Sequence, residues 1–250
     1  LDLMCSHFVL SLAARQGAED KAKELSEKLG MTIRVDWRTP VVEDGQKQAE
    51  FIEQLVASGT NGIAVSASDA KLLKTAIDSA VAKGVPVVTF DSDVPDSKRF
   101  AFFGTDDYQA GQRLATELAK SMDGKGVIAI LAGNQNAPNL QNRVRGVRDV
   151  IAKDFKDIKI LDTYYHPETP QDAVSKVEQV MGANPQITGW AMVGGWPLMT
   201  ENAMGKVKGR AKVIAVDALP EQLNYVRSGE VQMLLAQQVY EWGTTSVELL

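Results

Sequence analysis

The sequence predicts an α/β fold made of two similar sets of alternating strands and helices. Short apolar runs alternate along the whole chain with segments whose apolar residues recur at helical spacing. Several of the runs are apolar at nearly every position, which is typical of parallel strands covered by helices on both faces. The 250 residues suit one large or two medium domains of about 100–150 residues each.

The composition is that of an ordinary folded protein, with 44% hydrophobic and 24% charged residues. The formal net charge of −5 argues against nucleic acid or an anionic membrane surface as a partner, because both favour a basic face. The sequence contains no run of about 18 apolar residues, so no membrane-spanning helix is predicted.

The first set of elements is predicted over residues 8–104. A helix over 8–29 ends at Gly30, and its buried face is expected to consist of Leu12, Ala18, Ala22 and Leu25. Residues 31–37 alternate as a strand does, and the helix over 46–58 turns Phe51, Ile52 and Leu55 inward. The other elements are a helix over 69–84 and strands over 62–67, 86–92 and 100–104.

A second set begins after Gly104, where a short irregular strand ends. Its helices are predicted over 107–122, 139–155, 171–181, 197–207 and 220–227, and a last helix begins at Tyr240. Its strands are predicted over 126–133, 158–165, 189–193, 212–216 and 231–237. We therefore expect a domain boundary near Gly104, with a crevice between two α/β lobes for a small ligand.

Polar residues collect where these strands end. Because ligands of open parallel sheets bind beyond the carboxyl ends of the strands, these residues are the candidate site. They are Ser66, Ser68, Asp91, Asp93, Asn134, Gln135, Asn136, His166, Trp196, Asp217, Gln237 and Gln238. Hydroxyls, carboxamides, carboxylates and an aromatic ring suit a neutral polyhydroxylated ligand, since each desolvated sugar hydroxyl needs a donor and an acceptor.

Each candidate also has a structural interpretation. Asp91 and Asp93 could cap the next element, and Arg143 could be a solvated helix arginine like Arg145. Trp196 could belong to the core, and His166 could be a partly satisfied surface histidine. Asp217 is favoured as a ligand contact, because it ends the wholly apolar strand over 212–216.

Most enzymatic signatures are absent from the sequence. There is no Gly-x-Ser-x-Gly elbow and no phosphate-binding loop, and one cysteine with two distant histidines offers no zinc site. No cofactor is therefore expected. A carboxylate pair for glycoside hydrolysis, Asp91 with Asp217, is conceivable, but nothing in the sequence indicates that either is held protonated.

With these residues in place, the chain resembles the periplasmic sugar-binding proteins of the ribose-binding, LacI-like type, which are the solute receptors of ABC importers. The resemblance runs from about residue 8 to the last residue. Its motifs are Gly17-Ala18, GIAVSASD at 62–69, GVPVVTFD at 84–91, GTDDYQAG at 104–111, NxxxRxxG at 139–146, VIAVD at 213–217 and Ala236-Gln237. Each motif is weak alone, and the order and spacing make the set specific.

The resemblance implies two Rossmann-like lobes of the periplasmic binding protein type I architecture, which close about a hinge on a sugar or polyol. It implies one domain over 1–104 plus 238–250 and a second over 105–237. It implies ligand contacts at Ser66, Asp91, Arg143, Asp217 and Gln237, with Asn139 beginning the motif of Arg143. The contact position at 194–196 reads Gly-Gly-Trp here, where many relatives place Asn or Asp. We expect a non-enzymatic monomer in the periplasm, or outside the cell and tethered to the membrane, that delivers its ligand to a membrane permease.

Two departures from the relatives concern the ends of the chain. Relatives begin with a full apolar strand and an aromatic loop, whereas only residues 1–7 precede the first helix here, with Phe8 as the nearest remnant of that loop. Relatives also continue past the last helix. Both ends of the fold are therefore expected to be incomplete.

Two other functions stay open at this point. The effector domain of a LacI-like transcription regulator has the same fold, but it requires a preceding helix-turn-helix that residues 1–7 are too few to form. A sugar-acting enzyme that uses Asp91 and Asp217 is the third possibility.

Overall fold

The computed structural model describes residues 2–4, 8–40 and 44–250, and the chain divides into two compact units. Unit 1 comprises residues 1–105, 136–138 and 238–250, and unit 2 comprises residues 106–135 and 139–237. The chain thus passes from one unit to the other after Thr105 and again after Gln237, with residues 136–138 assigned to unit 1. Both units contain a five-stranded sheet whose neighbouring strands are all parallel.

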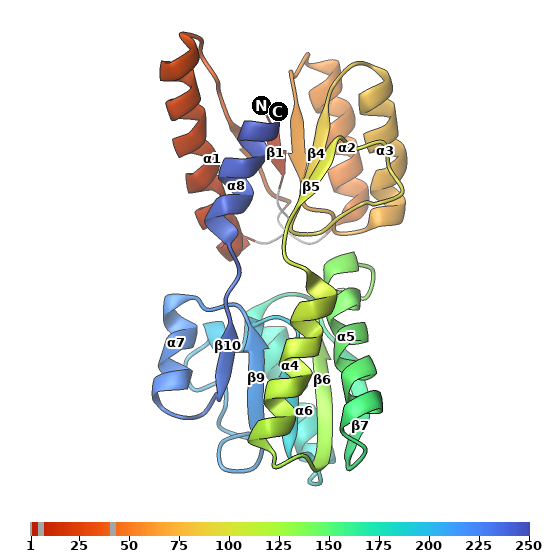
Figure 1. The fold of residues 1–250 in the computed structure, drawn as a ribbon, viewed down its shortest axis with the longest axis vertical. Helices are drawn as coiled ribbons and strands as arrows, with labels where there is room; N and C mark the ends of the chain where they lie inside the picture. Colours follow the sequence, from red (N-terminus) through yellow and green to blue (C-terminus); the bar gives the residue numbers. More distant parts are fainter. Residues whose placement is uncertain (1, 5–7, 41–43) are drawn as a thin grey trace. The chain divides into compact units, whose positions relative to one another are not determined.

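Unit 1 is a three-layer sandwich with the strand order β2-β1-β3-β4-β5. Its strands are β1 (Asp2–Met4), β2 (Asp36–Arg38), β3 (Ile63–Val65), β4 (Val87–Phe90) and β5 (Ala101–Phe103). Its helices are α1 (Phe8–Leu29), α2 (Gly45–Ala57), α3 (Ala70–Ala82) and α8 (Val239–Leu249). Figure 1 shows α1 and α8 on one face of the sheet and α2 and α3 on the other.

The two faces of this sheet are filled by alternate strand residues. Ile63, Val65 and Val87 pack with the apolar sides of α2 and α3, while Val88 and Phe90 pack with α1 and α8. A strand that is apolar at every position is buried on both sides in this way, because successive side chains point to opposite faces.

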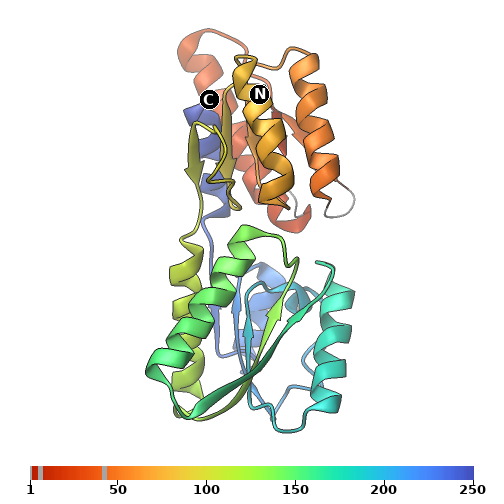
Figure 2. The same ribbon diagram turned by 90° about the vertical axis from the view of Figure 1, so that its right-hand side faces the viewer.

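Unit 2 repeats this topology with the strand order β7-β6-β8-β9-β10. Its strands are β6 (Gly126–Ala132), β7 (Ile158–Tyr165), β8 (Gly189–Met192), β9 (Lys212–Val216) and β10 (Met233–Leu235). Its helices are α4 (Asp107–Ser121), α5 (Pro138–Asp154), α6 (Pro170–Ala183), the 3₁₀ turn η1 (Trp196–Met199) and α7 (Pro220–Arg227). Helices α4 and α5 lie side by side, and α6 packs with η1 on the other face of the sheet (Figure 2).

The predicted alternation of strands and helices is confirmed, with corrections at five places. The strand predicted over 31–37 is only Asp36–Arg38, because its partner β1 has three residues and pairs Asp2 with Asp36 through Met4 with Arg38. Leu12 is 59% exposed, since α1 turns Ala14, Ala18 and Ala22 inward instead. The strand predicted over 231–237 is shortened to Met233–Leu235, which pairs along β9.

The first strand, expected to be missing, is present within unit 1. Asp2–Met4 lies between β2 and β3 and pairs in parallel with both. Three residues suffice because the strands on either side of it pair over the same short length. The sheet of unit 1 therefore has the same number and order of strands as the sheet of unit 2.

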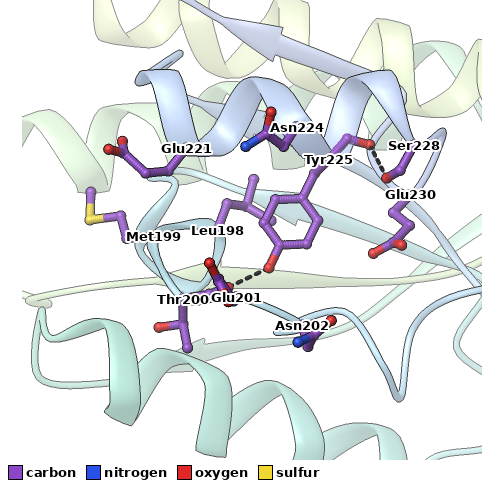
Figure 3. Close-up of a pocket in the computed structure, with 10 residues that line it drawn as sticks. All are labelled: Leu198, Met199, Thr200, Glu201, Asn202, Glu221, Asn224, Tyr225, Ser228 and Glu230. Atoms are coloured by element: carbon purple, nitrogen blue, oxygen red, sulfur yellow. Dashed lines mark hydrogen bonds between the residues drawn. The ribbon is translucent and has the colours of Figure 1, made fainter.

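The helix predicted over 197–207 is also wrong, because only the 3₁₀ turn over 196–199 forms and turns follow it. Asn202 has a left-handed backbone conformation, with φ of 58°, which interrupts a helix. The Tyr225 hydroxyl accepts a hydrogen bond from Ala203 N and donates one to the Thr200 carbonyl, as Figure 3 shows for the second contact. A side chain from α7 thus binds backbone groups that a helix would have used.

Candidate ligand-binding site

The carboxyl edge of the unit 1 sheet holds Ser66 and Asp91, both buried. Asp91 follows β4 directly and adopts φ of 55°. Its backbone N–H donates to the Phe103 carbonyl at 3.2 Å, and its Oδ2 accepts a hydrogen bond from Ser66 Oγ at 2.8 Å. The hydroxyl that follows β3 therefore orients the carboxylate that follows β4.

Gln48 supports this edge from α2, and the sequence analysis did not identify it. Its fully buried amide donates from Nε2 to the Ser66 carbonyl at 2.8 Å and accepts at Oε1 from Ser68 N at 2.9 Å. One side chain thus satisfies two backbone groups of the β3 to α3 loop. A polar residue on the inward side of a predicted helix was the available signal.

Asp93 accepts hydrogen bonds within its own segment, residues 89–99. Its carboxylate accepts hydrogen bonds from Thr89 Oγ1 at 2.6 Å, from Val94 N at 2.7 Å and from the Arg99 guanidinium, with 2.6 Å between Nη2 and Oδ2. Burial acts to raise the pKa of Asp93, but the hydrogen bonds from Arg99 and Thr89 outweigh it and hold the pKa below its usual value. Asp93 therefore ties the loop after β4 to Arg99.

Unit 2 places Arg143 in a buried network at the carboxyl edge of its sheet. Its Nε donates to Asp107 Oδ1 at 2.8 Å, and its Nη1 donates to the Val193 carbonyl at 2.9 Å. Its Nη2 donates to Gln237 Oε1 at 2.7 Å. The side chains of Arg143 and Asp107 are only 3% and 7% exposed, so Arg143 is not the solvated helix arginine that the sequence left open.

The network continues from Gln237 to Asp217. Gln237 Nε2 donates to Asp217 Oδ1 at 2.7 Å, and Gly195 N donates to Asp217 Oδ2 at 3.2 Å. The amide of Gln237 can take only one orientation here, because Arg143 requires an acceptor and Asp217 requires a donor. Asp107, Arg143, Gln237 and Asp217 thus form one continuous chain of hydrogen bonds.

Asp91 and Asp217 occupy equivalent places in the two units. Each follows the fourth strand in the shared strand order, and each has a positive φ, 55° and 76°. Each donates its backbone N–H to the neighbouring edge strand, Asp217 to the Leu235 carbonyl at 2.9 Å. The repeated topology therefore presents an aspartate in the same way at the carboxyl edge of each sheet.

Trp196 and His166 pack against each other at the same edge of unit 2. Their ring centroids lie 5.0 Å apart with an interplanar angle of 81°, and both side chains are buried. Gly194 permits this position of Trp196, because a Cβ at Gly194 would lie 2.4 Å from the indole ring. The unusual Gly-Gly-Trp segment thus places an aromatic residue beside a histidine.

Burial favours the neutral form of the His166 imidazole. Burial lowers its pKa below the usual 6.5, and this effect exceeds the opposing effects of the Pro167 carbonyl and of Glu168 and Asp172. Nδ1 faces the Pro167 carbonyl, and Nε2 has no hydrogen-bond partner among the described residues. A neutral imidazole that donates from Nδ1 has Nε2 as an acceptor, which could receive a ligand hydroxyl.

The two remaining candidates, Asn139 and Phe8, both lie at or near the start of a helix. Asn139 is buried near the start of α5, where its Oδ1 accepts a hydrogen bond from Leu140 N at 2.8 Å. Phe8 begins α1, but its side chain lies outside the described residues. Among the residues described, no three His, Cys, Asp or Glu side chains are grouped as a metal site would require.

Two hollows in unit 2 lie apart from these residues. One, of about 300 Å³, is lined by segments 198–202 and 221–230, with Tyr225 in its wall (Figure 3). The other, of about 570 Å³, lies at the amino ends of β6 and β9, where Gly126 and Lys212 line it. None of the sequence-predicted site residues lines either hollow.

Comparisons with known proteins agree on one family. A family model described as a periplasmic binding protein domain matches residues 11–250. The xylitol-binding protein of Mycolicibacterium smegmatis is 29% identical over 192 residues, which cover 75% of this chain and 54% of that protein. The ribose import binding protein of Bacillus subtilis is 30% identical over 144 residues, which cover 57% of this chain and 44% of that protein.

The folds of solved structures are also similar. An ABC transporter solute-binding protein from Burkholderia graminis, in complex with D-arabinose, superposes with a TM-score of 0.89 at 28% identity, covering 99% of this chain and 86% of that one. The matched part of the chain spans only about half the length of the two curated relatives named above. In the described parts of the chain, no helix is both long and apolar enough to cross a bilayer.

Proposed function

Because the chain belongs to the family of periplasmic binding protein domains, we propose that it is a receptor that binds a small sugar or polyol for an ABC importer. Its two units with parallel sheets have the type I architecture of that family. Relatives named for binding xylitol and ribose, and a similar solved structure that contains D-arabinose, support a polyhydroxylated ligand.

The observation that carries the proposal is the pair of equivalent aspartates. A carboxylate accepts hydrogen bonds from two vicinal hydroxyls, and both Asp91 and Asp217 are held at a strand end by neighbouring donors. Ser66 completes the set in unit 1. In unit 2 the proposed set is Asn139, Arg143, His166, Trp196, Asp217 and Gln237, and Phe8 remains proposed as an apolar contact.

For Asp93 we propose a supporting role, because its contacts with Thr89, Val94 and Arg99 tie together the segment that follows β4. Trp196 would supply an apolar surface for the C–H face of a sugar ring. The buried polar groups would make binding selective, since leaving one unpaired costs about 1–3 kcal/mol.

We further propose that the ligand is released unchanged to the membrane permease of an importer, and that the protein works as a monomer in the periplasm or tethered outside the cell. A relative named as an import binding protein and a similar ABC transporter solute-binding protein support the permease, and the description of the family as periplasmic supports the location. Recovery of an unaltered ligand by NMR after prolonged incubation would support binding without chemistry. Product release from an aryl glycoside, lost on Asp91→Asn, would instead indicate an enzyme.

Isothermal titration against D-ribose, D-arabinose, D-allose, D-xylose and xylitol tests the proposal. At least one should bind, and Asp91→Ala and Asp217→Ala should each weaken that binding by tenfold or more, about 1.4 kcal/mol. Asp149→Asn serves as the matched control. It removes an exposed carboxylate that accepts a hydrogen bond from the Tyr108 hydroxyl and belongs to none of the proposed sets. If none of these five compounds gives a heat of binding, the proposal that the chain is a sugar or polyol receptor is wrong.

A further inference from the structure

Arg143 contacts residues at both ends of unit 2. Asp107 is the second residue of the unit, directly after the first passage of the chain from unit 1. Gln237 is the last residue of the unit, directly before the chain returns to unit 1 at Gln238. Both side chains accept hydrogen bonds from the same guanidinium, at 2.8 and 2.7 Å. One arginine therefore holds the unit 2 ends of two connecting segments.

The ion pair with Asp107 fixes the position of this arginine. Both side chains are almost fully buried, so removing the carboxylate would leave a buried positive charge without its counterion. The Val193 carbonyl at the end of β8 accepts from Nη1 at 2.9 Å, so three separate acceptors hold the guanidinium. Asp107 also lies in the first turn of α4, where a negative charge is favourable.

The backbone brings Asp107 and Arg143 together as well. Helices α4 and α5 cross at two glycines: a Cβ at Gly111 would lie 2.0 Å from the Arg143 carbonyl oxygen, and one at Gly146 would lie 2.2 Å from the Tyr108 carbonyl oxygen. The two helices therefore touch through their main chains. The separation of Asp107 from Arg143 is set by this contact, and not by the ion pair alone.

We propose that Asp107 is a positioning residue that holds Arg143 between the two connecting segments, so that ligand binding at Arg143 is coupled to those segments. The proposal rests on the proposed function, because it assumes that Arg143 meets the ligand. A ligand that binds more tightly to one arrangement of Arg143 also favours the matching arrangement of Asp107 and Gln237, and the coupling is reciprocal. Asp107 itself acts only through Arg143.

Asp107→Asn tests this inference, since it keeps an acceptor for Nε and removes the charge. With a sugar or polyol that the unsubstituted chain binds, the variant should bind at least about tenfold more weakly, about 1.4 kcal/mol. Amide hydrogen exchange is the second measurement. Ligand should slow exchange in segments 104–108 and 235–239 of the unsubstituted chain, and this slowing should be lost in Asp107→Asn even when the ligand is saturating.

Asp149→Asn is again the matched control, because it removes one carboxylate from the same helix pair and should retain both the affinity and the slowing. Should Asp107→Asn fail to fold, Asp107→Glu, which keeps the charge but displaces it, should show the same losses. If the variant binds within twofold of the unsubstituted chain, or shows the same slowing, this inference is overturned while the receptor stands. If the unsubstituted chain binds none of the panel, the proposed function itself fails.

Discussion

Asp91 and Asp217 adopt left-handed backbone conformations directly after inner strands of their sheets. Aspartate tolerates this region better than most residues, but such a conformation still costs of the order of 1–3 kcal/mol and persists only where the surroundings hold it. Here the neighbouring edge strand holds the backbone N–H and neighbouring donors hold the carboxylate. The sharp change of direction turns each carboxylate to the edge of the sheet.

Substitution of Asp217 by alanine or by glycine distinguishes the cost of its left-handed backbone conformation from the loss of its carboxylate hydrogen bonds. Both variants lose the carboxylate, but only glycine adopts φ of 76° without a steric penalty. We expect Asp217→Gly to be more stable than Asp217→Ala by about 1 kcal/mol, the reverse of the order seen in ordinary helices. Urea unfolding measures the difference. An alanine variant as stable as the glycine variant would show that the left-handed conformation is not maintained.

His166 should make the stability of the chain depend on pH. Its pKa in the folded chain is lowered by burial, so near the usual value of 6.5 the unfolded chain binds more protons than the folded chain. The contribution of His166 to the free energy of unfolding is therefore fully present above about pH 7. It is lost as the pH drops through 6.5 towards the lowered pKa. The midpoint of urea unfolding between pH 8 and 5 should show this fall, and His166→Gln should flatten it.

The titration of Asp93 does not interfere with that measurement, because it changes the free energy of unfolding only at lower pH. Its lowered pKa stabilises the folded chain above the usual carboxyl value of 3.8, and that stability is lost only as the pH falls below this value. An identical dependence between pH 8 and 5 in the unsubstituted chain and in His166→Gln would contradict the assignment to His166.

At the scale of elements, pairs of helices cross at glycines in both units. In unit 1, α1 and α8 touch at Gly17 and Gly243, whose added Cβ atoms would lie 2.1 Å from the Tyr240 oxygen and 1.8 Å from the Ala14 oxygen. The crossing of α4 and α5 in unit 2 has the same character. A main-chain contact leaves no room to absorb even one methyl group, because both neighbours are backbone.

Gly111→Ala tests the crossing of α4 and α5. The added methyl group must separate the two helices, so we expect a loss of about 1–3 kcal/mol in the free energy of unfolding and weaker ligand binding. Gly182→Ala in α6 is the matched control, because nothing lies within 4 Å of its added Cβ. Alanine there should be neutral or slightly stabilising, since it favours helix more than glycine does. Equal effects of the two substitutions would rule out the steric explanation.

At the scale of the whole molecule, two units with the same strand order contribute different groups of residues to the proposed site. Unit 1 supplies Ser66 and Asp91, supported by the buried amide of Gln48. Unit 2 supplies the buried ion pair and the chain of hydrogen bonds that ends at Asp217. Because the chain enters unit 2 next to Asp107 and leaves it next to Gln237, the network of the proposed site is also where the units are joined.

The amino-acid sequence was sufficient to predict the α/β class, the positions of most strands and helices, and the strand-end aspartates Asp91 and Asp217. These depend on local periodicity and on which residue follows an apolar run, and both can be read from neighbouring positions. The family resemblance was needed to predict Arg143 as a ligand contact, because composition alone favours a solvated helix arginine at this position.

Which distant residues contact one another became clear only from the folded chain. Arg143 meets Asp107 across 36 positions and Gln237 across 94, and Gln48 meets Ser66 across 18. The three-residue strand β1 forms because β2 and β3 flank it, and segment 200–203 is bound by Tyr225 instead of forming a helix. The physical reason is that a buried polar group takes its partner from whatever the fold brings within about 3 Å, and local sequence preference carries no information about that neighbour.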